Sequence, residues 1–183
     1  MEKEECPRGR GRTQELTIHY RVCGFEELTE EERELMEAAI EATDRAYAPY
    51  SKFHVGAAAM VTGIANPLEQ TTGIANPLEQ KDYHVVTGSN QENMAYPSGL
   101  CAERTALFAA SAAYPEGKVT ALAIVGRNAK GELTGALPCG ACRQVMAEQQ
   151  MRQGCRMKVI CYYHDQVMVF DGIESLLPFG FEM

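Results

Sequence analysis

Apolar residues at helical spacing predict three helices along this chain. The first has a capping box of Thr29 with Glu32 at its start, and Pro49 lies beyond its end. Ser98 is the expected cap of the second, and the third opens at Pro138, because proline is favoured in the first turn of a helix. The predicted helices are Glu30–Ala46, Ser98–Ala113 and the segment that follows Pro138.

Shorter apolar runs between these helices predict strands. Some alternate apolar with polar residues, whereas the run after Lys118 is apolar almost throughout. The predicted strands are Leu16–Val22, Phe53–Met60, Tyr83–Thr87, Val119–Val125, Met157–Tyr162 and Gln166–Phe170. Helices alternate with these strands, and the second and third strands can join as a hairpin. The pattern therefore predicts an α/β fold with a mixed sheet.

A near-perfect tandem repeat separates the two hairpin strands. Residues Val61–Gln70 are followed by Thr71–Gln80, and each copy carries an Asn-Pro step that disfavours a continuous helix or a central strand. Two copies are too few for a solenoid, so we expect residues 61–81 to be an inserted loop. The length of 183 residues suits a single domain over residues 1–183, with residues 1–27 as an N-terminal extension.

Composition and charge exclude several classes of protein. No apolar run approaches the twenty or so residues of a membrane span, and the polar first residues lack the apolar core of a secretory signal. Seven cysteines, an odd number, favour a reducing compartment, so we expect a cytoplasmic protein with no membrane partner. The net charge of −8 opposes a nucleic-acid partner, and the basic cluster of Arg8, Arg10 and Arg12 is expected to be a solvated tail.

Two cysteine motifs carry the candidate chemistry. Cys101 is followed two residues later by Glu103, and Cys139 and Cys142 form a C-x-x-C motif after Pro138. A catalytic zinc site has three protein ligands and leaves one position to water, whereas a structural site is closed by four. A redox pair would leave Glu103 unexplained, and a zinc ribbon would need a second C-x-x-C motif, which the chain lacks. The motifs therefore predict a hydrolytic zinc site.

Several stretches around these cysteines match one known family. They are Tyr47–Phe53, Val55–Ala58, Gly88–Asn93, Tyr96–Thr105, Pro138–Gln144 and Leu176–Pro178. On these residues the chain resembles the cytidine deaminases of the cytidine/deoxycytidylate deaminase superfamily, over most of its length from about Leu28 to Phe181. The resemblance implies a three-layer α/β/α fold with a five-stranded mixed sheet covered by helices. It also implies one Zn²⁺ per chain and, from the three-cysteine ligand set, a homotetramer.

The resemblance and the motif chemistry together assign expected roles near the metal. Cys101, Cys139 and Cys142 are the expected zinc ligands, and Glu103 is the expected catalytic residue that carries protons between water and the pyrimidine. Three thiolates around Zn²⁺ leave an excess negative charge. Arg104 is expected to offset it by donating hydrogen bonds to the ligand sulfurs.

The substrate-binding residues are implied by the resemblance alone. Asn90 and Glu92 match the pair that binds a ribose hydroxyl, Phe53 matches the aromatic residue that packs against the base, and Ala102 lies in the matched motif. Phe181 matches a tail aromatic that reaches a neighbouring subunit's site in tetrameric relatives. If Phe53 and Asn90 face the substrate, the repeat lies at the other end of the hairpin, roughly 25 Å away.

The function implied by the resemblance is hydrolytic deamination of cytidine and deoxycytidine to uridine and deoxyuridine, with release of ammonia. A blasticidin-type or other nucleoside-analogue deaminase stays open, because it shares three cysteines and a small size. A catalytically inactive zinc scaffold is the alternative from another class, although it needs neither Glu103 nor the Asn90 and Glu92 pair. Nucleotide and tRNA deaminases fit less well, because they usually carry histidine where Cys101 stands.

Overall fold

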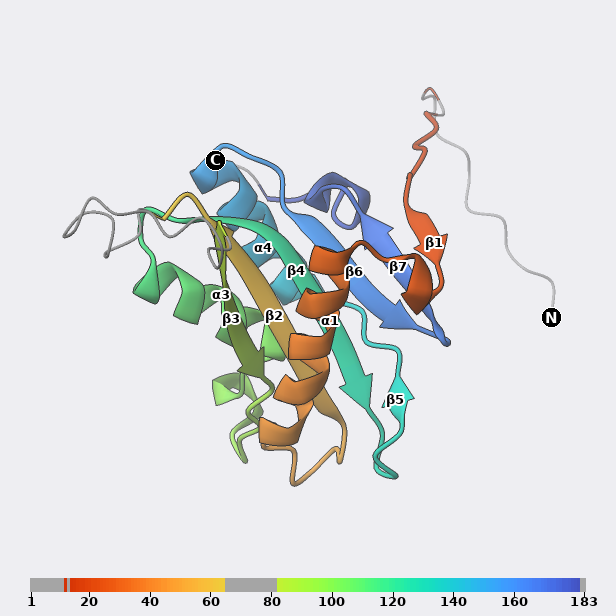
Figure 1. Cartoon of the computed structure of the whole chain (residues 1–183), viewed down its shortest axis with the longest axis vertical. Helices are drawn as coiled ribbons and strands as arrows, with labels where there is room; N and C mark the ends of the chain where they lie inside the picture. Colours follow the sequence, from red (N-terminus) through yellow and green to blue (C-terminus); the bar gives the residue numbers. More distant parts are fainter. Residues whose placement is uncertain (1–11, 13, 65–81, 182–183) are drawn as a thin grey trace.

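One mixed sheet organises the computed structural model, which describes residues 12, 14–64 and 82–181 (Figure 1). Its strands lie in the order β1-β7-β6-β4-β2-β3, and β5 pairs with β4 beside this path. The β4–β6 pair is parallel and the other pairs are antiparallel. The strands are β1 (Arg21–Cys23), β2 (His54–Thr62), β3 (Tyr83–Ser89), β4 (Lys118–Arg127), β5 (Leu133–Thr134), β6 (Lys158–Tyr163) and β7 (Gln166–Phe170).

Helices cover both faces of this sheet and make three layers. Figure 1 shows α1 (Glu30–Ala42) in front of the strands, with α3 (Ala102–Ala113) and α4 (Gly140–Gln153) behind them. The protein has a hydrophobic core on each face of the sheet. Successive residues of β2 belong to different cores, because successive side chains of a strand point to opposite faces. Ala57 and Ala59 pack in the core under α3 and α4, whereas Ala58 and Met60 pack in the core under α1.

The backbone of α3 lies very close to β3 at Gly88. A Cβ atom added at Gly88 would lie 2.3 Å from the backbone nitrogen of Ala106 and 2.7 Å from the carbonyl oxygen of Ala102. Glycine therefore lets the helix backbone rest directly on the strand. The first turn of α3 is thereby held against the end of the sheet where the cysteines lie.

The fold class predicted from the sequence is confirmed, but the strand count of five is wrong. The described part of the chain has seven strands. The N-terminal extension adds β1, which pairs with β7, although only Arg21 and Val22 of the predicted strand Leu16–Val22 lie in the ladder and Cys23 extends it. The other addition, β5, has two residues and therefore too little sequence for an alternating pattern.

The helix boundaries also differ from the prediction. The first helix ends at Ala42, and a 3-10 turn, Thr43–Arg45, follows it. Ser98 lies in another 3-10 turn, Tyr96–Ser98, so it does not cap α3. The N-cap residues of α3 and α4 are the two cysteines Cys101 and Cys139, in extended backbone conformations. The remaining 3-10 turns are Phe25–Glu27 and Ile173–Ser175.

The predicted hairpin of β2 and β3 is confirmed, with Thr62 opposite Tyr83 at one end and Gly56 opposite Ser89 at the other. The strand ends that flank the tandem repeat are therefore the ends farther from Asn90. Val61 and Thr62, which the prediction placed in the inserted loop, form the end of β2, and Val61 packs in the core under α3 and α4. Residues 65–81 of the predicted loop lie outside the described residues.

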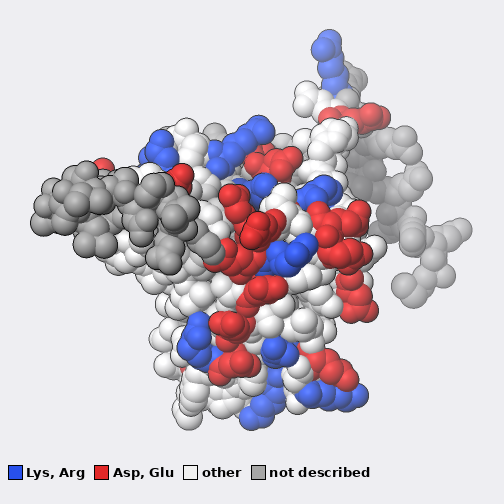
Figure 2. Space-filling view, in the orientation of Figure 1, with Lys and Arg blue, Asp and Glu red and all other residues white. Residues whose placement is uncertain are grey.

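The surface over α1 is acidic. Figure 2 shows Asp and Glu side chains gathered along this helix, and its exposed acidic residues are Glu30, Glu31, Glu37 and Glu41. Within the described ranges, the structure has no helix that is long and apolar enough to cross a membrane.

Candidate active site

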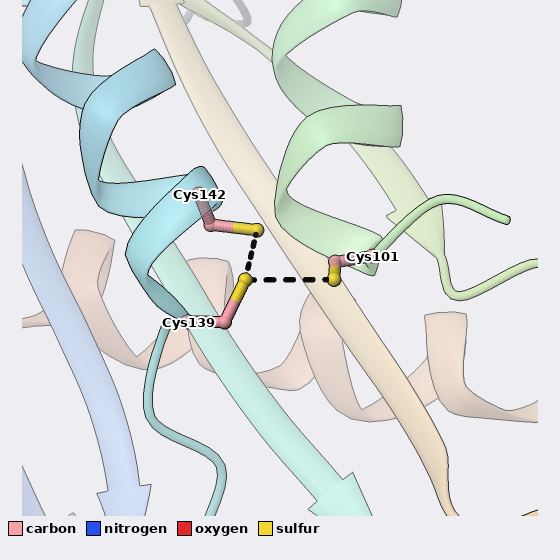
Figure 3. A group of neighbouring side chains, drawn as sticks. All are labelled: Cys101, Cys139 and Cys142. Carbon is pink, nitrogen blue, oxygen red and sulfur yellow. Dashed lines mark hydrogen bonds between the residues drawn. The ribbon is translucent and has the colours of Figure 1, made fainter. Parts of the chain in front are cut away.

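The thiols of Cys101, Cys139 and Cys142 converge where the N-termini of α3 and α4 meet (Figure 3). The Sγ atoms of Cys101 and Cys139 are 3.9 Å apart, and those of Cys139 and Cys142 are 3.5 Å apart. All three sulfur atoms lie within 4.8 Å of one another. Cys101 and Cys139 directly precede their helices, where free backbone amides and the helix dipole favour negative charge.

These distances fit a zinc ion. With Zn–S bonds of about 2.3 Å in a tetrahedral arrangement, two ligand sulfurs lie about 3.8 Å apart. The observed separations of 3.5 and 3.9 Å bracket that value. Cys142 is buried, Cys101 is partly buried and Cys139 is exposed, so the cluster has a closed side and an open side. A three-thiolate set open on one side matches a site that leaves one position to water.

Arg104 adds positive charge to this cluster. Its Nη2 atom lies 3.7 Å from the Cys101 Sγ, and its Nε atom is buried without a hydrogen-bond partner in the described part of the chain. A hydrogen bond from Cys142 and the contact with Arg104 together lower the pKa of Cys101 to about 5, against the opposing effect of burial. The same hydrogen bond with Cys101 raises the pKa of Cys142, because the two thiols share one proton. The cluster therefore favours at least one thiolate near neutral pH.

Glu103 lies in the first turn of α3 beside the sulfur atoms. Its side chain is 4% exposed, and this burial, together with the negative charge at Cys101, raises the pKa of its carboxyl to about 7. Burial disfavours the charged form of a carboxyl group, and a neighbouring negative charge has the same effect. The structure therefore brings one proton-carrying group next to the three thiols.

A cavity of about 530 Å³ opens over these groups. Phe53, Asn90, Glu92 and Ala102 all line it together with Glu103, so these four residues implied by the resemblance share one cavity. The volume lies within the range of about 300–1,000 Å³ that is usual for small-molecule sites.

The Phe53 ring is seated against β4 at the edge of the cavity. A Cβ atom added at Gly126 would lie 2.7 Å from Cζ of Phe53. The absence of a side chain at position 126 therefore gives the ring its place, and the ring presents an apolar wall to the cavity.

Asn90 and Glu92 bond to the segment that leads into β2. The Asn90 side-chain oxygen accepts a hydrogen bond from the Val55 amide at 2.7 Å, and its nitrogen donates one to the Phe53 carbonyl oxygen at 3.0 Å. One Glu92 oxygen accepts from the Tyr50 and Ser51 amides at 2.9 and 3.2 Å, and hydrogen bonds with Ser51 and Tyr50 hold its pKa below the usual range. Both side chains keep spare hydrogen-bonding capacity for a ligand.

Phe181 lies apart from this cavity. Its side chain is 71% exposed, and its residue lines a different hollow beside α4. The Gln144 side chain holds it there, because its amide donates to the Phe181 carbonyl at 2.9 Å and accepts from the Phe181 amide at 3.1 Å. The structure thus does not bring Phe181 together with Glu103 in one chain.

Two residues near the site were not singled out by the sequence analysis. Arg143 donates from Nε to the Pro138 carbonyl at 2.8 Å and from Nη1 to the Leu176 carbonyl at 2.9 Å, which ties the loop before Cys139 to the C-terminal segment. Gln144 is the second. Both follow Cys142 directly, so their place in the matched motif was the available signal.

Comparisons with known proteins agree with this geometry. The family described as "Cytidine and deoxycytidylate deaminase zinc-binding region" matches residues 69–158. A cytidine deaminase of Halalkalibacterium halodurans is 42% identical over 116 residues, which cover 62% of this chain and 68% of that protein. A probable cytidine deaminase of Dictyostelium discoideum is 30% identical over 150 residues, which cover 81% of this chain and 82% of that protein.

Solved structures give the same result. The crystal structure of cytidine deaminase from Burkholderia pseudomallei superposes with a TM-score of 0.60 at 37% identity, and the match covers 84% of this chain and all of that chain (100%). The similarity thus extends over the sheet, the helices and the cysteine cluster.

Proposed function

The chain belongs to the cytidine deaminase family, and from that premise we propose that it hydrolyses cytidine and deoxycytidine to uridine and deoxyuridine with release of ammonia. The observation that carries this proposal is that the buried carboxyl of Glu103 lines one open cavity together with Cys101 and Cys139, two members of a three-thiol cluster that Cys142 completes. The relatives named above are all called cytidine deaminases.

The proposed reaction requires a zinc ion at the three cysteines. Cys101, Cys139 and Cys142 would hold one Zn²⁺ per chain, and the bound ion supplies the Lewis acidity that makes a water molecule acidic near neutral pH. Arg104, 3.7 Å from the Cys101 sulfur, offsets the net negative charge that three thiolates leave around a divalent ion.

Glu103 carries the protons. It takes one proton from the attacking water and delivers it to the pyrimidine N3 as the oxygen bonds to C4. It then moves the remaining hydroxyl proton to the amino group, the C4–N bond breaks, and ammonia leaves. Its burial beside the thiols supports this role, because a carboxyl shielded from bulk water transfers protons to the substrate and not to solvent.

The cavity walls orient the nucleoside. Phe53 packs against the base, Asn90 and Glu92 bind the ribose, and Ala102 supplies backbone at the start of α3 beside Glu103. The supporting observation is that all of these residues line the 530 Å³ cavity. Their spare hydrogen-bonding groups match the hydroxyl groups of a neutral sugar better than they match a phosphate.

The assembly we propose is a cytoplasmic homotetramer that serves pyrimidine salvage. Phe181 is exposed and lies outside its own chain's cavity, which supports a role at a neighbouring subunit's site. The acidic surface over α1 supports a small neutral substrate without a nucleic-acid partner (Figure 2).

An ultraviolet assay of cytidine conversion tests the proposal, run with and without a chelator and beside a zinc count per chain. We expect chelator-sensitive ammonia release and one zinc per chain. A substrate panel of cytidine, deoxycytidine and blasticidin S measures the preference among substrates. A folded, zinc-loaded protein that releases no ammonia from cytidine or deoxycytidine would overturn the assignment.

A further inference from the structure

The segment that leads into β1 and the first residues of β1 expose a row of alternating apolar side chains. Leu16, Ile18, Tyr20 and Val22 are 56%, 45%, 51% and 47% exposed. Figure 1 shows this segment projecting beyond the sheet above β1. Within the described part of the chain, β1 is the last strand of the sheet and pairs on one side with β7. An unpaired strand edge is a template for pairing with another strand.

The segment continues the direction of β1 beyond the ladder. The Tyr20 ring stacks on Phe170 of β7 with centroids 5.4 Å apart, and the Ser175 hydroxyl donates to the His19 carbonyl at 3.1 Å. The carbonyl of His19 thus points toward the body of the protein. Because backbone groups of a strand alternate between its two edges, a strand conformation of this segment would turn those of Ile18 and Tyr20 to the free edge.

The sequence of this segment is complementary to itself in antiparallel orientation. Centred on Ile18, two copies place Leu16 opposite Tyr20 on one face. On the other face, Glu15 lies opposite Arg21 and Thr17 opposite His19. Opposite charges across a strand pair stabilise it, and so do paired aromatic and aliphatic residues.

We propose that residues 15–21 of two copies of this chain pair as antiparallel strands across a two-fold axis at Ile18. A two-fold axis repeats every contact between the two chains with the roles of the chains exchanged. Glu15 of each chain therefore pairs with Arg21 of the other, which gives two opposite-charge pairs. Arg21 already binds Glu32 at 2.9 Å, but its side chain is 46% exposed and has room for a second carboxylate. Centring the axis on Thr17 or His19 would lose the Glu15–Arg21 pair.

Cysteine cross-linking tests both the partner and the register. In the proposed pair, two Ile18 residues face each other with their Cα atoms about 5.5 Å apart, a separation that a disulfide spans. In the same register, Leu16 of one chain and Leu16 of the other are offset by four residues along the strands. This offset is about 13 Å, which is too far for a disulfide. We therefore expect zinc-loaded Ile18→Cys to form a covalent dimer under oxidised glutathione, while Leu16→Cys, on the same face and similarly exposed, stays at the wild-type background.

A mixture experiment sets the register independently. Leu16→Cys and Tyr20→Cys should each remain uncross-linked alone but form a mixed covalent dimer when combined. Adding Ile18→Lys to both variants brings two like charges together at the axis, and the mixed dimer should fall about tenfold. The readout is a non-reducing gel with the wild-type protein as control, so it does not depend on deaminase activity. Equal yields from Ile18→Cys and Leu16→Cys, or no cross-link above wild type, would overturn the proposal.

Discussion

Replacing Arg104 by glutamine should weaken zinc binding without unfolding the protein. In the wild-type chain, the guanidinium Nη2 lies 3.7 Å from the Cys101 sulfur. A unit charge pair at that distance interacts by about 4 kcal/mol at an effective dielectric constant of about 20. Arg104 is itself partly desolvated there, so only part of this energy is net stabilisation.

The expected net effect is a loss of zinc affinity of about 10- to 100-fold, the usual result of removing a side chain that supports a metal ligand. This corresponds to about 1.4–2.7 kcal/mol. Without the guanidinium, the Cys101 thiol also loses one cause of its lowered pKa, so zinc competes less well with protons at neutral pH.

Competition with a chromophoric zinc chelator measures this affinity, and circular dichroism checks that the fold is retained. Arg152→Gln is the matched control, because this substitution removes the same unit of positive charge. Arg152 donates to the Ser111 hydroxyl at 2.9 Å and not to a cysteine of the cluster. Zinc affinity of Arg104→Gln within twofold of both the wild type and this control would refute the reasoning.

Three further predictions concern the carboxyl groups and the repeat. Glu103→Gln should keep zinc and the fold but lose about 10²–10⁴-fold in turnover, measured by ultraviolet assay beside a zinc count; near wild-type turnover would contradict the assigned role. Glu32→Gln should lower the free energy of unfolding in urea by about 2 kcal/mol, because Glu32 is 5% exposed and accepts from Lys158 at 2.7 Å and Arg21 at 2.9 Å. Burial raises the pKa of Glu32, but these hydrogen bonds outweigh burial and lower the pKa overall. The stabilisation by Glu32 is therefore present above the unfolded-state pKa of about 4.3 and is lost as the pH falls below it. The control is Glu31→Gln, because Glu31 is exposed in the same helical turn; it should change the free energy of unfolding little above or below that pH. Deleting Thr71–Gln80, the second copy of the repeat, keeps Val61 and Thr62 of β2 and should leave turnover nearly unchanged; a large loss in a folded deletion variant would contradict the placement of the repeat.

The residues of the metal cluster could be predicted from sequence, but the helix starts around it could not. Motif spacing names Cys101, Cys139 and Cys142 without any knowledge of the fold. Capping preference, in contrast, favours Ser98 over cysteine, because a serine hydroxyl accepts a hydrogen bond from the helix amides. The structure places Cys101 and Cys139 at the N-caps, and neither side chain makes a capping bond. These helices therefore begin where the thiols must converge, against the local preference.

The positions of Asn90 and Glu92 show a second limit of the sequence. The resemblance alone selects both residues for the sugar, but the bonds from Asn90 to Phe53 and Val55 cross 37 and 35 residues of chain. No local pattern encodes such a contact, because it exists only once β2 and β3 pair. The consequence is functional, since the side chains assigned to the ribose also fix the segment that carries the aromatic wall for the base. We therefore expect recognition of the two ends of a nucleoside to be coupled through the backbone of residues 50–55, so that loss of either polar side chain disturbs base and sugar binding together.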